Sequence, residues 1–175
     1  FAIFLVACCN FTFATEVEPN DETPQVISFS ETIVGQLSSI TDVDKFSVVA
    51  STAGTITLSF SSDESSGNEW DVQLLDSSNN LLSSTVCGFS DCKSGISVPV
   101  GIASPGTYTV NVKSNGTYND SYLPEGLYRL TATYSTQMSG VEIEINDVSP
   151  QSIDFGETIV GQLSSITDVD KFSVV

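Results

Sequence analysis

The chain has 175 residues, of which 22 are acidic and five are basic, so its formal net charge is −17. Nucleic-acid binding depends on Lys and Arg that neutralise phosphates, so this balance excludes a nucleic-acid partner and disfavours docking on anionic lipid. The chain has no His, which excludes Ser-His-Asp and Cys-His catalysis and the HExxH zinc motif. The excess of acidic residues is consistent with solubility outside the cell. The alternative is that some of the carboxylates are there to hold a hard cation.

Residues 1–14 are predicted to be the remainder of a leader peptide. The apolar run at residues 1–9 leads to the small-residue pattern TFA at residues 12–14, which is typical of a signal-peptide cleavage site. A second interpretation takes LVAC at residues 5–8 as a lipobox, which would make Cys8 a lipidated N-terminus. The run is well short of the roughly 20 apolar residues of a membrane-spanning helix. Both leaders predict a secreted or cell-surface protein.

Alternation of apolar and polar residues dominates from residue 31 to residue 134 and predicts short β-strands. No stretch shows helical spacing over about 11 residues or more. About eight short strands with one apolar face predict an all-β fold, an antiparallel β-sandwich or jelly roll. The expected core positions include Ile56, Leu58, Phe60, Trp70, Val72, Leu74, Ile96, Val98, Val100, Tyr108, Val110, Val112, Tyr128, Leu130, Ala132 and Tyr134.

A long internal repeat divides the chain. Residues 157–175 repeat residues 31–49 letter for letter, and residues 16–49 match residues 142–175 at 27 of 34 positions. Such repetition indicates an array of similar modules. The second copy is below the size that folds unaided, so we expect it to be poorly ordered or wrongly docked. The predicted parts are the leader at 1–14, a sandwich domain at 15–135, a linker at 136–141 and a truncated second copy at 142–175.

Each repeat opens with the acidic motif E-x-E-x-N-D. Alternate side chains of an extended segment project to one side about 7 Å apart, so the Glu and Asn side chains can curl toward one point, and the Asp can join them. Carboxylate and amide oxygens are the ligands that Ca²⁺ prefers, and it takes about six to eight of them. The candidate ligands are Glu16, Glu18, Asn20 and Asp21, with Glu142, Glu144, Asn146 and Asp147 in the second copy.

The segment TDVDKF follows each motif at the same distance and is the expected source of further ligands. Asp44 shares strand parity with Phe46 and Val48, so it should lie at the rim of the core face, where a buried charge needs a partner. A cation would provide that partner and fasten the N-terminal segment to the sandwich. The alternative is a solvated acidic linker followed by an Asx-rich turn. The further candidate ligands are Asp42, Asp44, Asp168 and Asp170.

Several motifs follow one another along the chain, namely EVEPND, VGQL followed by DVDKFSV, AGTITLSF, WDVQLLD, and PGTYTVNV followed by GLYRLTATY. Together they resemble the bacterial pre-peptidase C-terminal domain family, which includes the collagen-binding domains of clostridial collagenases. The resemblance covers residues 16–134 and restarts at residue 142. It implies a β-sandwich, secretion, tandem copies appended to a larger extracellular protein, and Ca²⁺ bound at the N-terminal linker.

This chain departs from the family pattern at two positions. Some calcium-binding members have an acid at the position of Thr41, whereas here Asp42 follows one residue later. The second copy has Ile145 in place of the Pro of the opening motif. Asp42 is therefore the least secure of the ligands that the resemblance implies.

Cys87 and Cys92, in the segment CGFSDC, are predicted to form a small disulfide loop. Two thiols so close together, outside the cytosol, most simply pair with each other. A metal site would need further Cys or His nearby, and a redox-active pair would be expected to show the CxxC spacing, which is absent here. The other two cysteines, Cys8 and Cys9, belong to the predicted leader.

Catalysis is not expected in this region. A glycosidase would need a pair of carboxylates, but the available acids are more simply turn or solvated strand residues. For binding, the Tyr pair of the polar loop NGTYNDSYLPEG is the best exposed candidate to stack on a sugar or a protein, and ordinary loop anchoring is the alternative. The acids considered for catalysis are Asp71, Asp76, Asp91 and Asp120, and the two tyrosines of the polar loop are Tyr118 and Tyr122.

The sequence therefore predicts a non-catalytic, secreted or cell-surface module in a tandem array. Ca²⁺ at its N-terminal linker would stiffen the array, and its partners would be the neighbouring repeats of the same chain. One alternative is an adhesion module that binds an extracellular glycan or matrix protein. Another is a secretion or maturation appendage of an exported peptidase.

Overall fold

The computed structural model describes residues 13–63, 69–115, 126–137, 140–144, 146, 149–164 and 167–175. In these ranges no helix is long and apolar enough to cross a membrane. The described elements are the strands Phe13–Thr15 (β1), Gln25–Val26 (β2), Thr32–Gly35 (β3), Val43–Ala50 (β4), Gly54–Ser62 (β5), Trp70–Leu75 (β6), Leu81–Cys87 (β7), Ile96–Ile102 (β8), Gly106–Ser114 (β9), Tyr128–Ser135 (β10), Ile143–Glu144 (β11), Gln151–Ile153 (β12) and Phe172–Val174 (β13), and the helix Phe89–Ser94 (α1).

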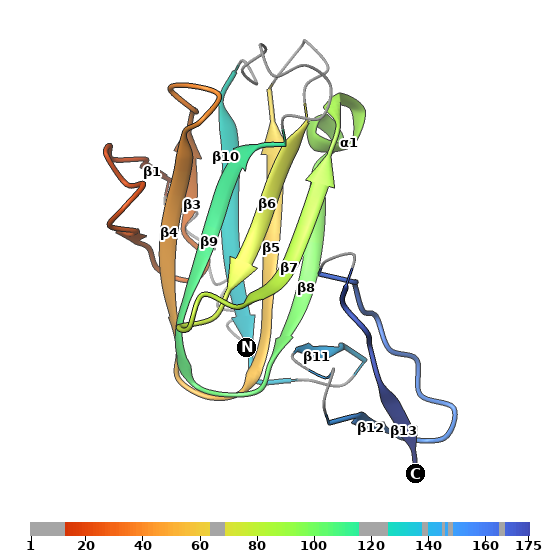
Figure 1. Ribbon diagram of the computed structural model, residues 1–175. Coiled ribbons are helices and arrows are strands. Elements are labelled where there is room, and N and C mark those ends of the chain that lie inside the picture. Colours follow the sequence, from red (N-terminus) through yellow and green to blue (C-terminus); the bar gives the residue numbers. More distant parts are fainter. Residues whose placement is uncertain are drawn as a thin grey trace, which may run out of the picture.

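Two β-sheets pack face to face as a sandwich, which confirms the all-β fold class (Figure 1). One sheet has the strand order β1-β3-β10-β5-β8-β11 and the other has the order β2-β4-β9-β6-β7. The long strands pair antiparallel, as the alternation predicts. Four short pairs are parallel, namely β1 with β3, β2 with β4, β11 with β8 and β12 with β13. The sheets are therefore mixed, because the short segments reach their partners by crossovers instead of hairpins.

Strand β1 begins inside the predicted leader. Phe13 and Ala14 pair with Thr32 and Ile33 of β3, although the small-residue pattern assigns both to the leader. The remainder of the predicted leader, including Cys8, lies outside the described residues.

The core lies between the sheets and consists of the alternating apolar residues. Phe46 and Val48 of β4 are fully buried, as are Trp70 and Tyr128. The rings of Phe60, Trp70 and Tyr128 form an aromatic cluster with centroid separations of 5.4, 5.5 and 5.7 Å. Pairs of this kind contribute about 0.5–1.5 kcal/mol beyond their area burial. This cluster places the Tyr128 ring in the core with its hydroxyl group directed to the rim.

Helix α1 is an element that the sequence pattern did not predict. It has six residues, too few for a helical period to be recognised. Cys87 at the end of β7 and Cys92 within α1 form a disulfide with an S–S distance of 2.04 Å, and both side chains are buried. The predicted pairing of these two cysteines is confirmed.

Replacement of both Cys87 and Cys92 by Ser is expected to lower the free energy of unfolding by about 2 kcal/mol, the loop-closure entropy of so short a loop. Urea denaturation monitored by Trp fluorescence measures this change. Native protein treated with a reductant should lose the same amount, and an unchanged midpoint in both samples would contradict the prediction.

Candidate metal centre

The segment that opens each repeat is tied to the sandwich by backbone and side-chain hydrogen bonds. We call residues 13–26, and their equivalents 139–152, the head segments. In the first head segment Glu16 N donates to Val34 O of β3 at 3.0 Å, and Glu16 Oε2 accepts from Gln36 N at 3.0 Å. Within the segment, Val17 N donates to the Gln25 side chain at 2.8 Å. These bonds hold the chain extended at Glu16 and turn it back toward β4.

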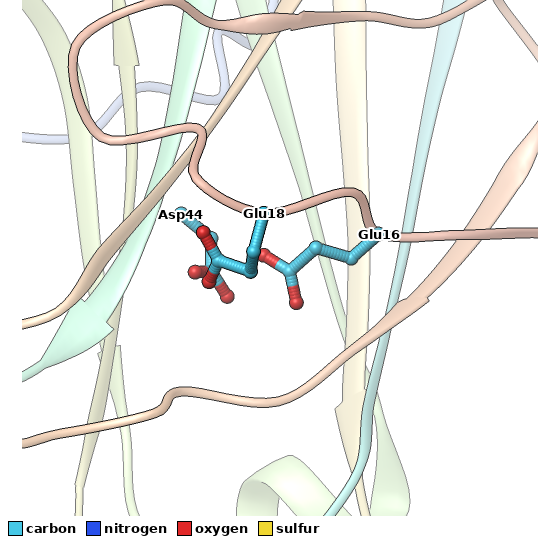
Figure 2. Close-up of side chains that lie close together, drawn as sticks. All are labelled: Glu16, Glu18 and Asp44. Carbon is cyan, nitrogen blue, oxygen red and sulfur yellow. The ribbon is translucent and has the colours of Figure 1, made fainter.

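Three carboxylates converge where the head segment meets β4 (Figure 2). Glu16, Glu18 and Asp44 each offer a carboxylate oxygen, and these oxygens lie within 4.8 Å of one another. The two Glu side chains come from alternate positions of the head segment, as the E-x-E spacing predicts. Asp44 is completely buried on the core face of β4. We call these three residues the first carboxylate cluster.

Asn20 lies beside the cluster and orients Glu16. Its Nδ2 donates to Glu16 Oε1 at 2.9 Å, and its Oδ1 accepts from Lys45 N at 2.9 Å. Both the donor nitrogen and the acceptor oxygen of this buried side-chain amide are therefore hydrogen-bonded within the protein. Asn20 therefore joins the head segment to β4, and its Oδ1 already accepts a backbone hydrogen bond.

Asp21 and Asp42, also predicted as ligands, are placed around the cluster and not within it. Asp21 Oδ1 accepts from Val43 N at 3.3 Å. Asp42 Oδ2 accepts from Ser38 N in the turn before β4, and the Asp42 side chain is buried. Their negative charges nevertheless act on the cluster, because each contributes to the raised pKa of the Glu18 carboxyl.

Gly35 and Gln36, of the VGQL motif, close the other side of Glu16. Gln36 N donates to Glu16 Oε2 at 3.0 Å. A Cβ atom on Gly35 would lie 2.5 Å from the same oxygen and would also overlap the Tyr128 hydroxyl. Only glycine permits this approach, a requirement that the sequence pattern did not reveal.

Tyr128 is the second site residue that sequence reasoning missed, because its parity assigns it only to the core. Its hydroxyl group donates to Asp44 Oδ2 at 2.6 Å. The other oxygen, Asp44 Oδ1, is buried and has no hydrogen-bond partner. A buried acceptor without a partner is rare in native proteins and calls for an explanation.

The cluster is electrostatically unfavourable when it holds only protein atoms. Burial raises the pKa of Asp44 to about 9, and the neighbouring Glu16 carboxyl adds to the shift. Burial also raises the pKa of Glu18. Lys113 pairs with Asp71 and Arg129 pairs with Asp63, and neither of these ion pairs includes a residue of the first carboxylate cluster.

The second repeat reproduces the arrangement almost bond for bond. Glu142, Glu144 and Asp170 also bring oxygens within 4.8 Å of one another, and we call them the second carboxylate cluster. Asn146 Nδ2 donates to Glu142 Oε1 at 2.7 Å, and Asn146 Oδ1 accepts from Lys171 N at 3.0 Å. The hydrogen bonds around this cluster thus match those of the first, whereas Leu163 and Phe172 are exposed although their equivalents Leu37 and Phe46 are buried.

The remaining candidates of the second repeat follow the same pattern. Asp168 accepts from Ser164 N, as Asp42 does from Ser38 N. Asp170 Oδ1 is buried without a hydrogen-bond partner, like its equivalent in Asp44. Asp147 lies outside the described residues.

The acids considered for catalysis are structural where they are described. Asp71 is buried, in contrast to the solvated position expected, and pairs with Lys113 Nζ at 3.4 Å. Asp76 accepts from Ser78 N and Asn80 N in a turn, and Asp91 is exposed on α1. The fourth acid and the two candidate stacking tyrosines, Asp120, Tyr118 and Tyr122, lie outside the described residues.

The fold and the cluster define a β-sandwich module with converging oxygen donors where its head segment meets the sheet. Residues 42–114 match the family model described as the bacterial pre-peptidase C-terminal domain. This match agrees with the resemblance that the motifs carry. Members of that family are non-catalytic modules of exported peptidases.

Two solved structures are similar to this chain. The pre-peptidase C-terminal domain of a collagenase from Bacillus anthracis is 20% identical, with 63% of this chain and 94% of that chain covered and a TM-score of 0.48. A β-glucosidase from Paenibacillus barengoltzii is 13% identical, with 69% of this chain and 13% of that chain covered and a TM-score of 0.26. No curated protein matches the chain. Neither structural likeness bears on the chemistry of the clusters.

Replacement of Gly35 by Ala is expected to lower the free energy of unfolding by about 1–3 kcal/mol, the usual cost of overpacking. The added Cβ would displace the Glu16 carboxylate and the Tyr128 hydroxyl. The matched control is Gly88→Ala, where nothing lies within 4 Å of an added Cβ. Chemical denaturation of both variants provides the comparison, and equal stabilities would refute the tight approach at Gly35.

In metal-free protein, the contribution of Asp44 to stability is expected to fall as the pH rises from about 4 to about 9. Its pKa is raised from 3.8 to about 9, so the folded state holds the proton more tightly than the unfolded state, and stability decreases with pH in this window. The free energy of unfolding should be measured against pH in chelator for native protein and for Asp44→Asn. The variant should show the flatter profile; parallel profiles would rule out the shift.

Proposed function

We propose that this chain is part of an exported, non-catalytic β-sandwich module that binds Ca²⁺ at its carboxylate clusters. The ion joins the head segment to the sandwich through Glu16, Glu18 and Asp44, and through the equivalent residues Glu142, Glu144 and Asp170 in the second repeat. Its role is mechanical, because it stiffens the junction at which each module of a tandem array begins.

The observation that carries the proposal is the state of Asp44. Its side chain is fully buried, its Oδ1 has no hydrogen-bond partner, and two further carboxylates face it. A buried carboxylate of this kind is costly unless it is paired or coordinates a metal. A cation offsets the mutual repulsion of the three acids and completes the coordination of the orphaned oxygen.

The donor set fits Ca²⁺ in its chemistry and its dimensions. Three carboxylates supply up to six hard oxygen atoms, and Ca²⁺ takes about six to eight oxygens at about 2.3–2.6 Å. Two ligands of one such ion are therefore separated by no more than about 5 Å, and the three oxygens lie within 4.8 Å of one another. Mg²⁺ fits less well, because it usually keeps several waters and binds only about one or two carboxylates.

The position of the cluster supports a fastening role. Glu16 and Glu18 belong to the head segment, whereas Asp44 belongs to β4 and contacts the core through Tyr128. An ion shared by these residues cross-links the segment that leads into the module with its packed core. Metal that binds only the folded arrangement stabilises it by mass action.

The ligand-binding alternative remains a prediction of the sequence, since Tyr118 and Tyr122, on which it rests, lie outside the described residues. The appendage alternative agrees with the family at the level of the whole module, and it is compatible with Ca²⁺ binding. The first carboxylate cluster favours the cation function over both, because three acidic side chains converge there around the buried oxygen of Asp44 that has no hydrogen-bond partner.

Calorimetric titration of the chain with Ca²⁺ is expected to give two bound ions, one at each cluster. At a concentration about 100 times the Kd, each ion stabilises the module to which it binds by about 2.7 kcal/mol. Asp44→Asn should remove one ion from the stoichiometry and abolish the Ca²⁺-dependent rise in the melting temperature of the sandwich.

The control is Glu22→Gln, which removes one negative charge from the same exposed head segment without changing the cluster. It should keep both ions. Absence of heat and of any shift in melting temperature at millimolar Ca²⁺ in the native chain would overturn the proposed function.

A further inference from the structure

We propose that the edge of β8 is a docking site for the head segment of a following copy of the same module, so that consecutive modules share one continuous β-sheet. The inference rests on the tandem arrangement in the proposed function, but it does not depend on bound Ca²⁺. Its template is the contact between the two repeats of this chain.

The backbone of the second head segment extends the first module's sheet. Strand β11 pairs parallel with β8, with Ile143 opposite Gly101 and Glu144 opposite Ile102. Gly101 N donates to Glu142 O at 3.0 Å. Figure 1 shows β11 beside β8, on the side of the sandwich away from β1.

The same few residues also pair with their own repeat. Glu142 N donates to Val160 O at 2.9 Å, and Val141 forms a parallel bridge with Val160. Val34, the equivalent of Val160, belongs to β3 in the first module. The segment at residues 141–144 therefore lies between the β8 edge of one module and the strand equivalent to β3 in the next.

Gly101 is shaped for this contact. A Cβ atom at this position would overlap the carbonyl oxygen of Glu142, and its three nearest atoms all belong to Glu142 and Ile143. The absence of a side chain at Gly101 thus makes room for the docked segment and not for a neighbour within the first module.

Gln162 extends the contact to the other sheet. Its Oε1 accepts from Ser83 Oγ at 3.0 Å and from Thr85 Oγ1 at 3.1 Å, while its Nε2 donates to Ser84 O. These three residues lie on β7, the edge strand of the second sheet. The second repeat therefore covers both sheet edges on one side of the sandwich, which are otherwise open to pairing with other chains.

The first head segment supplies the undocked reference within the same chain. Val17, equivalent to Ile143, is 64% exposed, whereas Ile143 is half-buried. Glu18 is exposed, whereas its equivalent Glu144 is 7% exposed. The burial of the equivalent glutamines differs in the same way, because Gln36 is exposed whereas Gln162 is half-buried. The two heads share their local hydrogen bonds, so the difference in burial comes from the neighbouring module.

Main-chain pairing to an exposed sheet edge is a general mode of recognition. Here the occupant is identified as another copy of the module, because the residues that dock belong to the repeated motif E-x-E-x-N-D and to the repeated VGQL segment. The receiving edge contributes Gly101 and the polar groups of β7.

Amide hydrogen exchange of the whole chain, measured in excess chelator, tests the docking. The amide of Gly101 should be protected in native protein. In Gln162→Ala its exchange should be faster by on the order of tenfold, because local opening becomes easier. Gln36→Ala, the equivalent change at the undocked head, should leave the protection of Gly101 unchanged.

Gly101→Val provides a second variant whose fold can be verified independently. It should expose residues 141–144 to exchange while the near-UV signal of Trp70 stays native. An unprotected Gly101 amide in native protein, or unchanged exchange at residues 141–144 in Gly101→Val, would overturn the docking. Protection in chelator together with an absence of Ca²⁺ heat would overturn only the cation function.

Discussion

The carboxyl group of Asp44 is removed from water at the start of β4, where the Tyr128 hydroxyl contacts one oxygen and no hydrogen bond reaches the other. An ionised carboxylate at such a place costs several kcal/mol unless charge or metal compensates it. The Tyr128 ring is in turn fixed by its contacts with Phe60 and Trp70. The packing of the core and the geometry of the carboxylate cluster are therefore determined by the same side chains. The head segment meets the sandwich at the point where the buried Asp44 carboxyl group faces Glu16 and Glu18.

The second repeat separates what the local sequence encodes from what the core contributes. The bonds from Asn146 to Glu142 and from Lys171 to Asn146 join residues of the second repeat to one another and include no residue of the first module's core. Short-range hydrogen bonds within the head segment and its VGQL partner thus suffice to gather the carboxylates. The second repeat is in addition held against β7 and β8 of the first module.

Local periodicity predicts the parts of this structure that depend on parity along a strand. The burial of Asp44 follows from its parity with Phe46 and Val48, and the convergence of Glu16 with Glu18 follows from their alternate spacing. The contribution of Tyr128 could not be predicted, because it lies 84 positions from Asp44 and its partner is set by sheet order. Gly35 could not be predicted either, since its role depends on how closely Glu16 approaches a different strand. The parallel pairing of β1 with β3 likewise depends on a crossover that leaves no periodic signal.

The two ends of the larger sheet have different consequences for assembly. Its β1 edge belongs to a head segment, while β8, at the opposite side, receives one. A contact between two different surfaces is heterologous, and unless its rotation happens to close a ring, repeating it builds an open filament. Because each sheet carries a right-handed twist from strand to strand, every added module would be rotated in the same sense relative to the one before it. A row of such modules would then wind as a superhelix whose pitch is set by the few residue pairs between β11 and β8.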